Sequence, residues 1–347
     1  MEESPLIDFY PKKMFNKQVL LVRLLFFLPF LVLILYLLNY YSTEPLYFWI
    51  GIVLWVFCLI AYIGINAVLE TGIIATNWDD MDYTSFRKIN IPFNGIDGKP
   101  QAAYLYIPDG VDINNSKTPA IIGFHGWNSH HREMDRYCLP TAFSEKYLYF
   151  TMDARGQGNT QGSKNDFDQF DDSIKFIDMV SKLPYVDNTR ISVVGMSMGS
   201  ARTAYAAYDH PYVRSCIMLS GPYDLYYTRH HLLFIQKVLF LLSGCRFPKT
   251  DELLKKYSGI NKFKSEGVKL AYSNSPVPNE KRIFLAANKN DPVVTWKNTE
   301  FAIDKLKLPE TNYRIFPKGN HCFDGNEYYL SVDIYRFLKK TLNEPIN

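Results

Sequence analysis

The residues best suited to chemistry form a Gly-x-Ser-x-Gly pattern near the middle of the chain. Gly195, Ser197 and Gly199 supply it, the apolar run Ile191–Val194 precedes it, and a helix-forming stretch follows. A serine at a strand-to-helix turn exposes its hydroxyl, and glycines on both sides relieve contact with the neighbouring backbone. The helix that begins there also favours negative charge near its N-terminus. The pattern therefore predicts an exposed, reactive Ser197 hydroxyl.

Alternating strands and helices must position this serine. The runs AIIGF, LYFTM, ISVVG and CIMLS are nearly all apolar, which is typical of strands covered on both faces. Strand and helix patterns that alternate in this way predict crossover units and a mainly parallel sheet. We expect strands near Arg87–Pro92, Ala102–Ile107, Ala120–Phe124, Tyr147–Met152, Ile191–Gly195, Arg214–Ser220, Arg282–Ala287 and Tyr313–Phe316. We expect helices near Asp166–Leu183, Met198–Tyr208, Thr295–Leu306 and Glu327–Leu342.

Four segments of this region stand out in chain order: Phe124-His125-Gly126-Trp127, the DARGQG segment from Asp153, the GMSMGS segment around Ser197, and Gly319-Asn320-His321. Together they resemble the α/β-hydrolase superfamily, in particular its serine esterases and its acetyl xylan esterase and prolyl-oligopeptidase-like branches. The resemblance covers most of residues 85–347. It implies an α/β-hydrolase fold with a mainly parallel eight-stranded sheet and a cap insertion at about residues 222–281.

The resemblance also implies a Ser-His-Asp triad. Ser197 matches the nucleophile, and His321, in the loop after the last expected strand, matches the general base. The third member is an acid that orients the imidazole and stabilises its protonated form. Asp291 follows the strand at Arg282–Ala287 and gives the family's chain order, so it is the favoured acid. Asp224, after the preceding strand, is the alternative.

The same resemblance places an oxyanion hole beside Ser197. Its two donors would be the backbone N–H of Met198, the residue after the nucleophile, and the backbone N–H of Trp127, in the loop after the third strand. The Trp127 side chain either lines an acyl pocket or packs on the core. Within the cap, His231–Leu242 reads HLLFIQKVLFLL, which predicts a cap helix packed on the core, with an interfacial helix as the alternative.

The first 70 residues have a different composition. Residues 19–38 carry one charge, Arg23, and residues 46–65 carry none, and a helix of about 20 residues spans a bilayer. We expect transmembrane helices at about 19–38 and 46–68, joined by the short turn Asn39–Pro45 and followed by a linker at 70–84. Lys12, Lys13 and Lys17 precede the first span, which predicts a cytoplasmic tail at 1–18 and a catalytic domain at 85–347 that faces the cytoplasm.

Composition narrows the functional classes that remain for this protein. Lys and Arg total 38 against 35 acidic residues, so the net charge of +3 gives no field that would gather nucleic acid. The five cysteines are scattered and form no CxxC pair, so we expect neither a zinc site nor a disulfide framework, and no cofactor. The leading hypothesis is a membrane-anchored serine hydrolase that cleaves small-molecule or lipid carboxylic esters. The alternatives are a serine peptidase or amidase and a non-catalytic membrane scaffold. The oligomeric state is left open.

Overall fold

The computed structural model describes residues 83–345, apart from 235, 238, 239, 241–243 and 322, together with residues 33, 34, 36, 49, 52, 53 and 56. The transmembrane helices expected at 19–38 and 46–68 lie outside the described residues except at those seven positions, as does almost all of the linker at 70–84. None of the helices formed by described residues has the length and apolar character needed to cross a bilayer.

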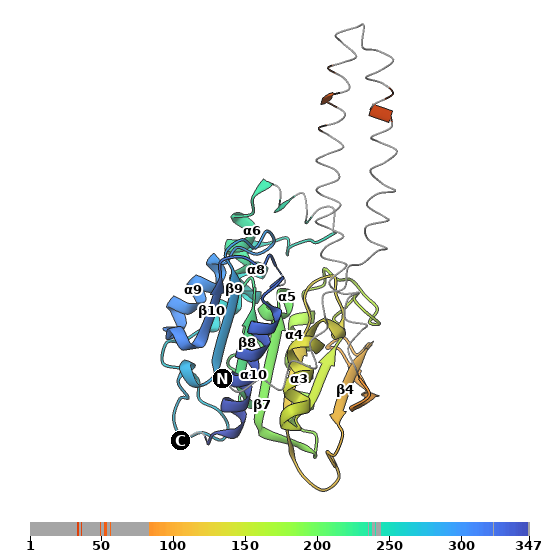
Figure 1. Cartoon of the computed structure of the whole chain (residues 1–347), viewed down its shortest axis with the longest axis vertical. Helices are drawn as coiled ribbons and strands as arrows, with labels where there is room; N and C mark the ends of the chain where they lie inside the picture. The colour runs from red at the N-terminus through yellow and green to blue at the C-terminus, as the bar shows by residue number, and fades with distance from the viewer. Residues whose placement is uncertain are drawn as a thin grey trace.

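An eight-stranded, mainly parallel sheet forms the centre of the described structure (Figure 1). Its strands, in spatial order, are β1 (Phe86–Asn90), β4 (Ala103–Pro108), β6 (Leu148–Met152), β5 (Thr118–Phe124), β7 (Val186–Met196), β8 (Val213–Leu219), β9 (Ile283–Asn288) and β10 (Tyr313–Phe316). Strand β4 pairs antiparallel with β1 and β6, and all later neighbours pair in parallel. The short strands β2 (Phe93–Asn94) and β3 (Pro100–Gln101) form a separate antiparallel pair. The predicted α/β-hydrolase sheet is confirmed.

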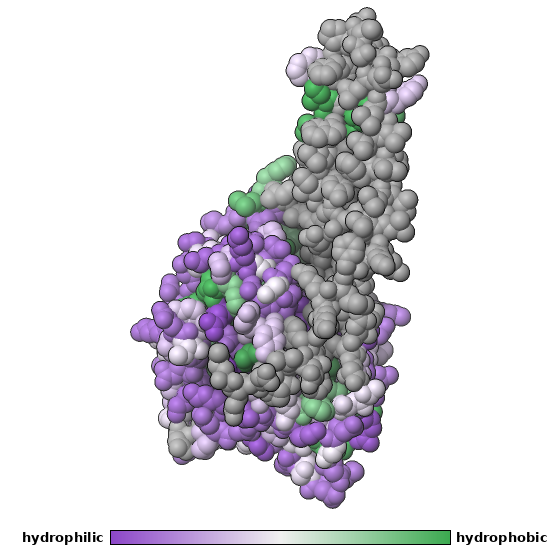
Figure 2. Space-filling model, viewed as in Figure 1, coloured by the Kyte–Doolittle hydropathy of each residue, from purple (hydrophilic) through white to green (hydrophobic). Residues whose placement is uncertain are grey.

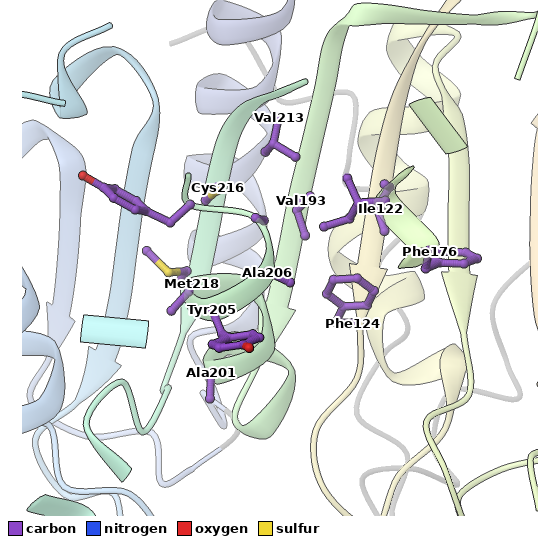
Figure 3. Close-up of a cluster of buried hydrophobic side chains, with 14 of the residues drawn as sticks. Ile122, Phe124, Phe176, Val193, Ala201, Tyr205, Ala206, Val213, Cys216 and Met218 are labelled. Atoms are coloured by element: carbon purple, nitrogen blue, oxygen red, sulfur yellow. The ribbon is translucent and has the colours of Figure 1, made fainter. Parts of the chain in front are cut away.

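Helices cover both faces of this sheet. Helices α3 (Asp135–Glu145) and α10 (Glu327–Asn343) pack on one face, and α4 (Gln169–Ser181), α5 (Met198–Ala206) and α9 (Lys297–Leu306) pack on the other. Successive residues of a strand point to opposite faces, so Val193 belongs to one core and Val194 to the other. Figure 3 shows part of the core that contains Val193, with Ile122 and Phe124 of β5, Val193 of β7 and Phe176 of α4 labelled.

The chain between β8 and β9 forms an insertion, in the region where the cap was expected. It contains α6 (Leu225–His230), α8 (Asp251–Tyr257) and the 3-10 turns η4 (Gly259–Lys262) and η5 (Asn279–Lys281). The helix expected at His231–Leu242 lies partly outside the described residues. Hydrophilic residues predominate on the described surface in Figure 2, whereas Leu233 and Phe234 of this insertion are 65% and 82% exposed.

Helix α3 was not expected from the sequence. It contains Pro140, which removes a helical hydrogen bond, and its residues Asp135–Ala142 are all buried. A helix buried on all sides has no polar stripe, so the usual periodic signal is missing. The 3-10 turn η3 (His131–Met134) leads directly into α3 and places residues of the preceding loop beside the carboxyl end of β5.

Candidate active site

The expected site residues lie in loops that follow parallel strands. His125 and Gly126 follow β5, Ser197 follows β7, Asp291 follows β9, and His321 follows β10. Because parallel strands point the same way, these loops meet at the carboxyl edge of the sheet, which is where open α/β sheets bind ligands. The fold thus gathers side chains that are more than a hundred residues apart in the sequence.

Ser197 occupies a strained turn between β7 and α5. Its φ of 54° and ψ of −119° are unusual for a residue with a side chain, and such strain is characteristic of functional sites. The Ser197 N–H donates to Leu219 O of β8 at 2.8 Å, which fixes the turn against the sheet. A side chain at Gly199 would overlap the carbonyl oxygen of Phe124, and one at Gly195 would overlap that of Gly199. Gly199 therefore allows α5 to lie directly against β5, and Gly195 allows the same helix to lie directly against β7.

Three of the expected residues form a hydrogen-bonded series. His321 Nε2 lies 2.7 Å from Ser197 Oγ, and His321 Nδ1 lies 2.7 Å from Asp291 Oδ2. With Nδ1 donating to the carboxylate, Nε2 is left to accept the Ser197 proton. The other oxygen, Asp291 Oδ1, accepts from the N–H groups of Val293 and Val294 at 2.8 and 2.9 Å. These bonds hold the acid in one orientation.

Asp224, the alternative acid, has a different position. It is the N-cap of α6, and its side chain accepts from the Tyr227 N–H at 2.8 Å. A capping carboxylate satisfies one of the N–H groups that a helix leaves unpaired at its start. The carboxylate hydrogen-bonded to His321 is that of Asp291.

The surroundings of His321 favour its protonated form. Burial by itself lowers the pKa of His321, but the nearby carboxylates of Asp291, Glu133 and Asp324 raise it, and the net effect is a pKa above the ordinary value of 6.5. Asp291 contributes most of this increase through its charge and its hydrogen bond. An imidazole of this kind is a stronger base toward a serine hydroxyl.

The loop after β5 leaves one backbone donor without an acceptor. The Gly126 N–H donates to Glu133 Oε2 and the Asn128 N–H donates to Gln157 Oε1, both at 2.5 Å. Between them, the Trp127 N–H has no acceptor among the residues that the structure describes. Two side chains therefore fix the amides on either side of the Trp127 N–H.

A second backbone donor lies at the start of α5. Met198 is the first residue of that helix, so the helix provides no acceptor for its N–H. Of the two donors expected from the sequence, Trp127 therefore lies in the loop after β5 and Met198 lies directly after Ser197, at the start of α5. The Trp127 ring has a separate role, because its Nε1 donates to Lys164 O at 3.1 Å and the ring packs against the core.

Two histidines outside this series are structural. His125 is fully buried, and burial lowers its pKa to about 3, so it is neutral. Its Nδ1 lies 2.7 Å from Gly126 O, and its Nε2 accepts from the Ala154 N–H at 2.9 Å. His131 pairs with the carboxylate of Asp153 at 2.9 Å. In the described part of the chain, no group of three or more His, Cys, Asp or Glu side chains is placed to hold a metal ion.

Sequence reasoning missed two charged residues next to the site. Glu133, in η3, is 7% exposed and carries the hydrogen bond from Gly126. Arg202, in α5, is fully buried and donates from Nη2 to His125 O at 2.7 Å. Neither residue belongs to a motif. The only available signal for Arg202 was that it is the one charged residue in the helix-forming stretch Met198–Ala206.

Sequence comparison gives a family model and a curated relative. The family model described as "Serine aminopeptidase, S33" matches residues 115–256. The chain is 28% identical over 138 residues to the 2,6-dihydropseudooxynicotine hydrolase of Paenarthrobacter nicotinovorans, which is 38% of this chain and 35% of that protein. The match thus spans about a third of the length of this curated relative.

Solved structures share the fold at low identity. Est1E of Butyrivibrio proteoclasticus, solved with ferulic acid bound, superposes with a TM-score of 0.55 at 17% identity over 74% of this chain and 100% of its own. Oligopeptidase B of Leishmania major gives 0.57 at 11% identity over 76% of this chain but 38% of its own. The fold, the family model and these likenesses together show that the chain is a serine hydrolase of the α/β-hydrolase superfamily.

Proposed function

We propose that the protein hydrolyses carboxylic esters through an acyl-enzyme formed on Ser197. The observation that carries this proposal is the hydrogen-bonded series of Ser197, His321 and Asp291, with both bonds to the imidazole at 2.7 Å. A hydroxyl, a base and an acid in this order are the parts that nucleophilic acyl transfer requires.

The proposed reaction has two halves. Ser197 Oγ attacks the ester carbonyl while His321 Nε2 takes its proton, and the resulting oxyanion accepts bonds from the N–H groups of Trp127 and Met198. The tetrahedral intermediate collapses, the bond to the leaving alcohol breaks, and His321 gives the alcohol its proton. Water then attacks the acyl-enzyme in the same way, and the acid and free Ser197 are released. Asp291 stabilises the imidazolium in both halves.

An ester is favoured over a peptide as substrate by the extent of the structural likenesses. The esterase Est1E is covered over 100% of its chain, and the Pyrococcus furiosus esterase Pf2001 over 94%. Oligopeptidase B is covered over only 38% of its chain. The second candidate is a peptidase or amidase, which the description of the family model favours. The same triad and oxyanion hole serve amides.

The proposal also includes membrane anchoring, which we infer from the amino-acid sequence alone. The apolar stretches at 19–38 and 46–68 would place the catalytic domain next to a bilayer on its cytoplasmic side. Lipid esters concentrate at such an interface, so they form a substrate class that suits an anchored esterase.

A serine-directed phosphonate tests the proposed chemistry. The full wild-type chain should be labelled and should hydrolyse nitrophenyl esters faster than aminoacyl nitroanilides. Ser197→Ala should not be labelled, and His321→Ala should be labelled at least a hundredfold more slowly, because triad members act as a unit. Equal labelling of wild type and Ser197→Ala would reject the nucleophile. Faster cleavage of the nitroanilides would favour the peptidase.

A further inference from the structure

Glu133 lies next to the proposed nucleophile without belonging to the triad. A Cβ built on Gly126 would be 3.2 Å from Glu133 Oε2, 3.5 Å from Glu133 Oε1 and 3.2 Å from Ser197 Cβ. The Glu133 carboxylate and Ser197 Cβ therefore both lie close to the same point beside Gly126. Glu133 is 7% exposed, so little water screens its charge there.

Glu133 and His125 together fix both backbone groups of Gly126. The Gly126 N–H donates to Glu133 Oε2 at 2.5 Å, and Gly126 O lies 2.7 Å from His125 Nδ1. The Gly126 carbonyl and the Trp127 N–H belong to one planar peptide and point in opposite directions. Fixing Gly126 at both ends therefore fixes the direction of the Trp127 N–H, which is one of the two proposed oxyanion donors.

The negative charge of Glu133 has an effect beyond the hydrogen bond that its carboxylate accepts from the Gly126 N–H. A neutral amide oxygen would accept the same bond without the cost of burying a charge. The Glu133 carboxylate acts on His321 together with Asp291 from the loop after β9 and Asp324 from the loop of His321 itself. The buried cation of Arg202, on α5, interacts electrostatically with Glu133. The charge is therefore placed where it favours a protonated His321.

We propose that Glu133 is a positioning residue for the reaction at Ser197. It anchors Gly126 so that the Trp127 N–H faces the developing oxyanion, and its charge stabilises the His321 imidazolium that forms when Ser197 loses its proton. This inference rests on the proposed function and assigns a role to a residue outside the triad and the oxyanion hole.

Two substitutions separate the hydrogen bond from the charge. Glu133→Gln keeps an acceptor for the Gly126 N–H and removes the charge, whereas Glu133→Ala removes both. Glu145→Gln is the matched control, because Glu145 lies at the far end of α3 and bonds to Tyr335 and Lys339 instead. All variants are made in the full chain. For each we would measure the melting temperature, the rate of phosphonate labelling, and kcat and KM for a nitrophenyl ester from pH 5 to pH 9.

In Glu133→Gln, the acid limb of kcat/KM should move to lower pH by about half to one unit, because loss of a nearby negative charge lowers the pKa of His321. We also expect kcat to fall about threefold to tenfold with little change in KM. Glu133→Ala should lose about a further tenfold in kcat, because the oxyanion donor is no longer fixed. Glu145→Gln should match wild type in all three measurements.

The outcomes separate the inference from the proposed function. If wild type labels and Glu133→Gln keeps the wild-type acid limb and kcat within twofold, the charge has no role. A Glu133→Ala variant that folds and keeps kcat within twofold would reject the anchoring role. If Glu133→Ala does not fold, the Gln variant still decides the role of the charge. If wild type and Ser197→Ala behave alike, the proposed function fails, and the role of Glu133 fails with it.

Discussion

At the scale of single residues, two carboxylates that follow neighbouring strands have different partners. Asp291 bonds to His321 at 2.7 Å and is fixed by two backbone N–H groups, whereas Asp224 caps α6. A carboxylate that orients an imidazole cannot be replaced by an amide without favouring the wrong tautomer. A capping carboxylate can be replaced by asparagine at little cost, because both are good N-cap residues.

Asp291→Asn should therefore lower kcat by about three to four orders of magnitude, while Asp224→Asn keeps kcat within about threefold. Ester hydrolysis by the purified full-length variants, with melting temperatures to confirm folding, checks this. A severe loss in Asp224→Asn together with near-normal Asp291→Asn would show that the acid is misassigned.

The environment of His321 gives the reaction a defined pH dependence. Burial lowers the pKa of His321, but the carboxylates of Asp291, Glu133 and Asp324 raise it above 6.5 overall. The base must be neutral to accept the Ser197 proton, so kcat/KM should fall about tenfold per pH unit once the pH drops below this pKa. We expect the midpoint of the acid limb above pH 6.5. A midpoint below pH 6 would contradict this description of the site.

At the scale of elements, the contact between α5 and β5 leaves no room for a side chain. Gly199→Ala would force a methyl group into the backbone carbonyls of Phe124 and His125, which cannot move without shifting the sheet. We expect a loss of roughly 3 kcal/mol in the free energy of unfolding and about 6 to 10 °C in melting temperature. Calorimetry or circular dichroism measures both.

Gly98→Ala is the control for this prediction. Gly98 has a φ of 78° but no atom within 4 Å of a built Cβ, so alanine there meets only backbone strain. That strain costs about 1 kcal/mol. If the two alanine variants melt at the same temperature, the close contact of α5 with β5 does not contribute to stability as described.

At the scale of the whole molecule, membrane attachment is the property that the N-terminal sequence predicts. The full chain should remain in the membrane fraction after washes with high salt and carbonate, and detergent should release it. Protease added outside intact cells should leave residues 85–347 uncut. Release by carbonate would contradict the anchor, and cleavage from outside would reverse the orientation.

Substrate selection is a second property at this scale. Leu233 and Phe234 are exposed on the insertion after β8, and Gln236 of the same segment donates to Pro292 O, next to Asp291, at 3.0 Å. An apolar segment that is hydrogen-bonded beside the site in this way favours longer acyl chains. Each methylene of the substrate that is buried contributes about 0.8 kcal/mol to the binding free energy. We expect kcat/KM to rise from C2 to C8 nitrophenyl esters. A steady fall from C2 upward would leave a short-chain esterase.

The DARGQG segment, which resembles acetyl xylan esterases, is not evidence against a preference for longer acyl chains. Asp153 accepts from the N–H and Nδ1 of His131, and Arg155 forms a paired contact with the buried Asp172 of α4 at 2.5 and 2.9 Å. Both side chains therefore fasten the loop after β6 to its neighbours. They carry no information about the length of the acyl group.

The sequence by itself determined the sheet and the order of its main helices. Strands buried on both faces are continuous apolar runs, and this signal is local, so the observed β4, β6 and β8 begin and end within a residue or so of the expected bounds. The glycines around Ser197 are also local, because a strand-to-helix turn needs them whatever lies elsewhere in the chain. Helix α3 could not be found in this way, since burial on all sides removes the periodic pattern.

Only the tertiary structure decided which side chains meet. Asp291 and Asp224 both follow strands, and their roles differ because β10 carries the His321 loop beside β9. Glu133 belongs to no motif, and it bonds to Gly126 near Ser197 because the fold places η3 beside the loop after β5. Hydrogen bonds act over about 3 Å and charge effects over roughly 10 Å, between residues that the fold brings together from distant parts of the chain. No local pattern in the sequence records that proximity.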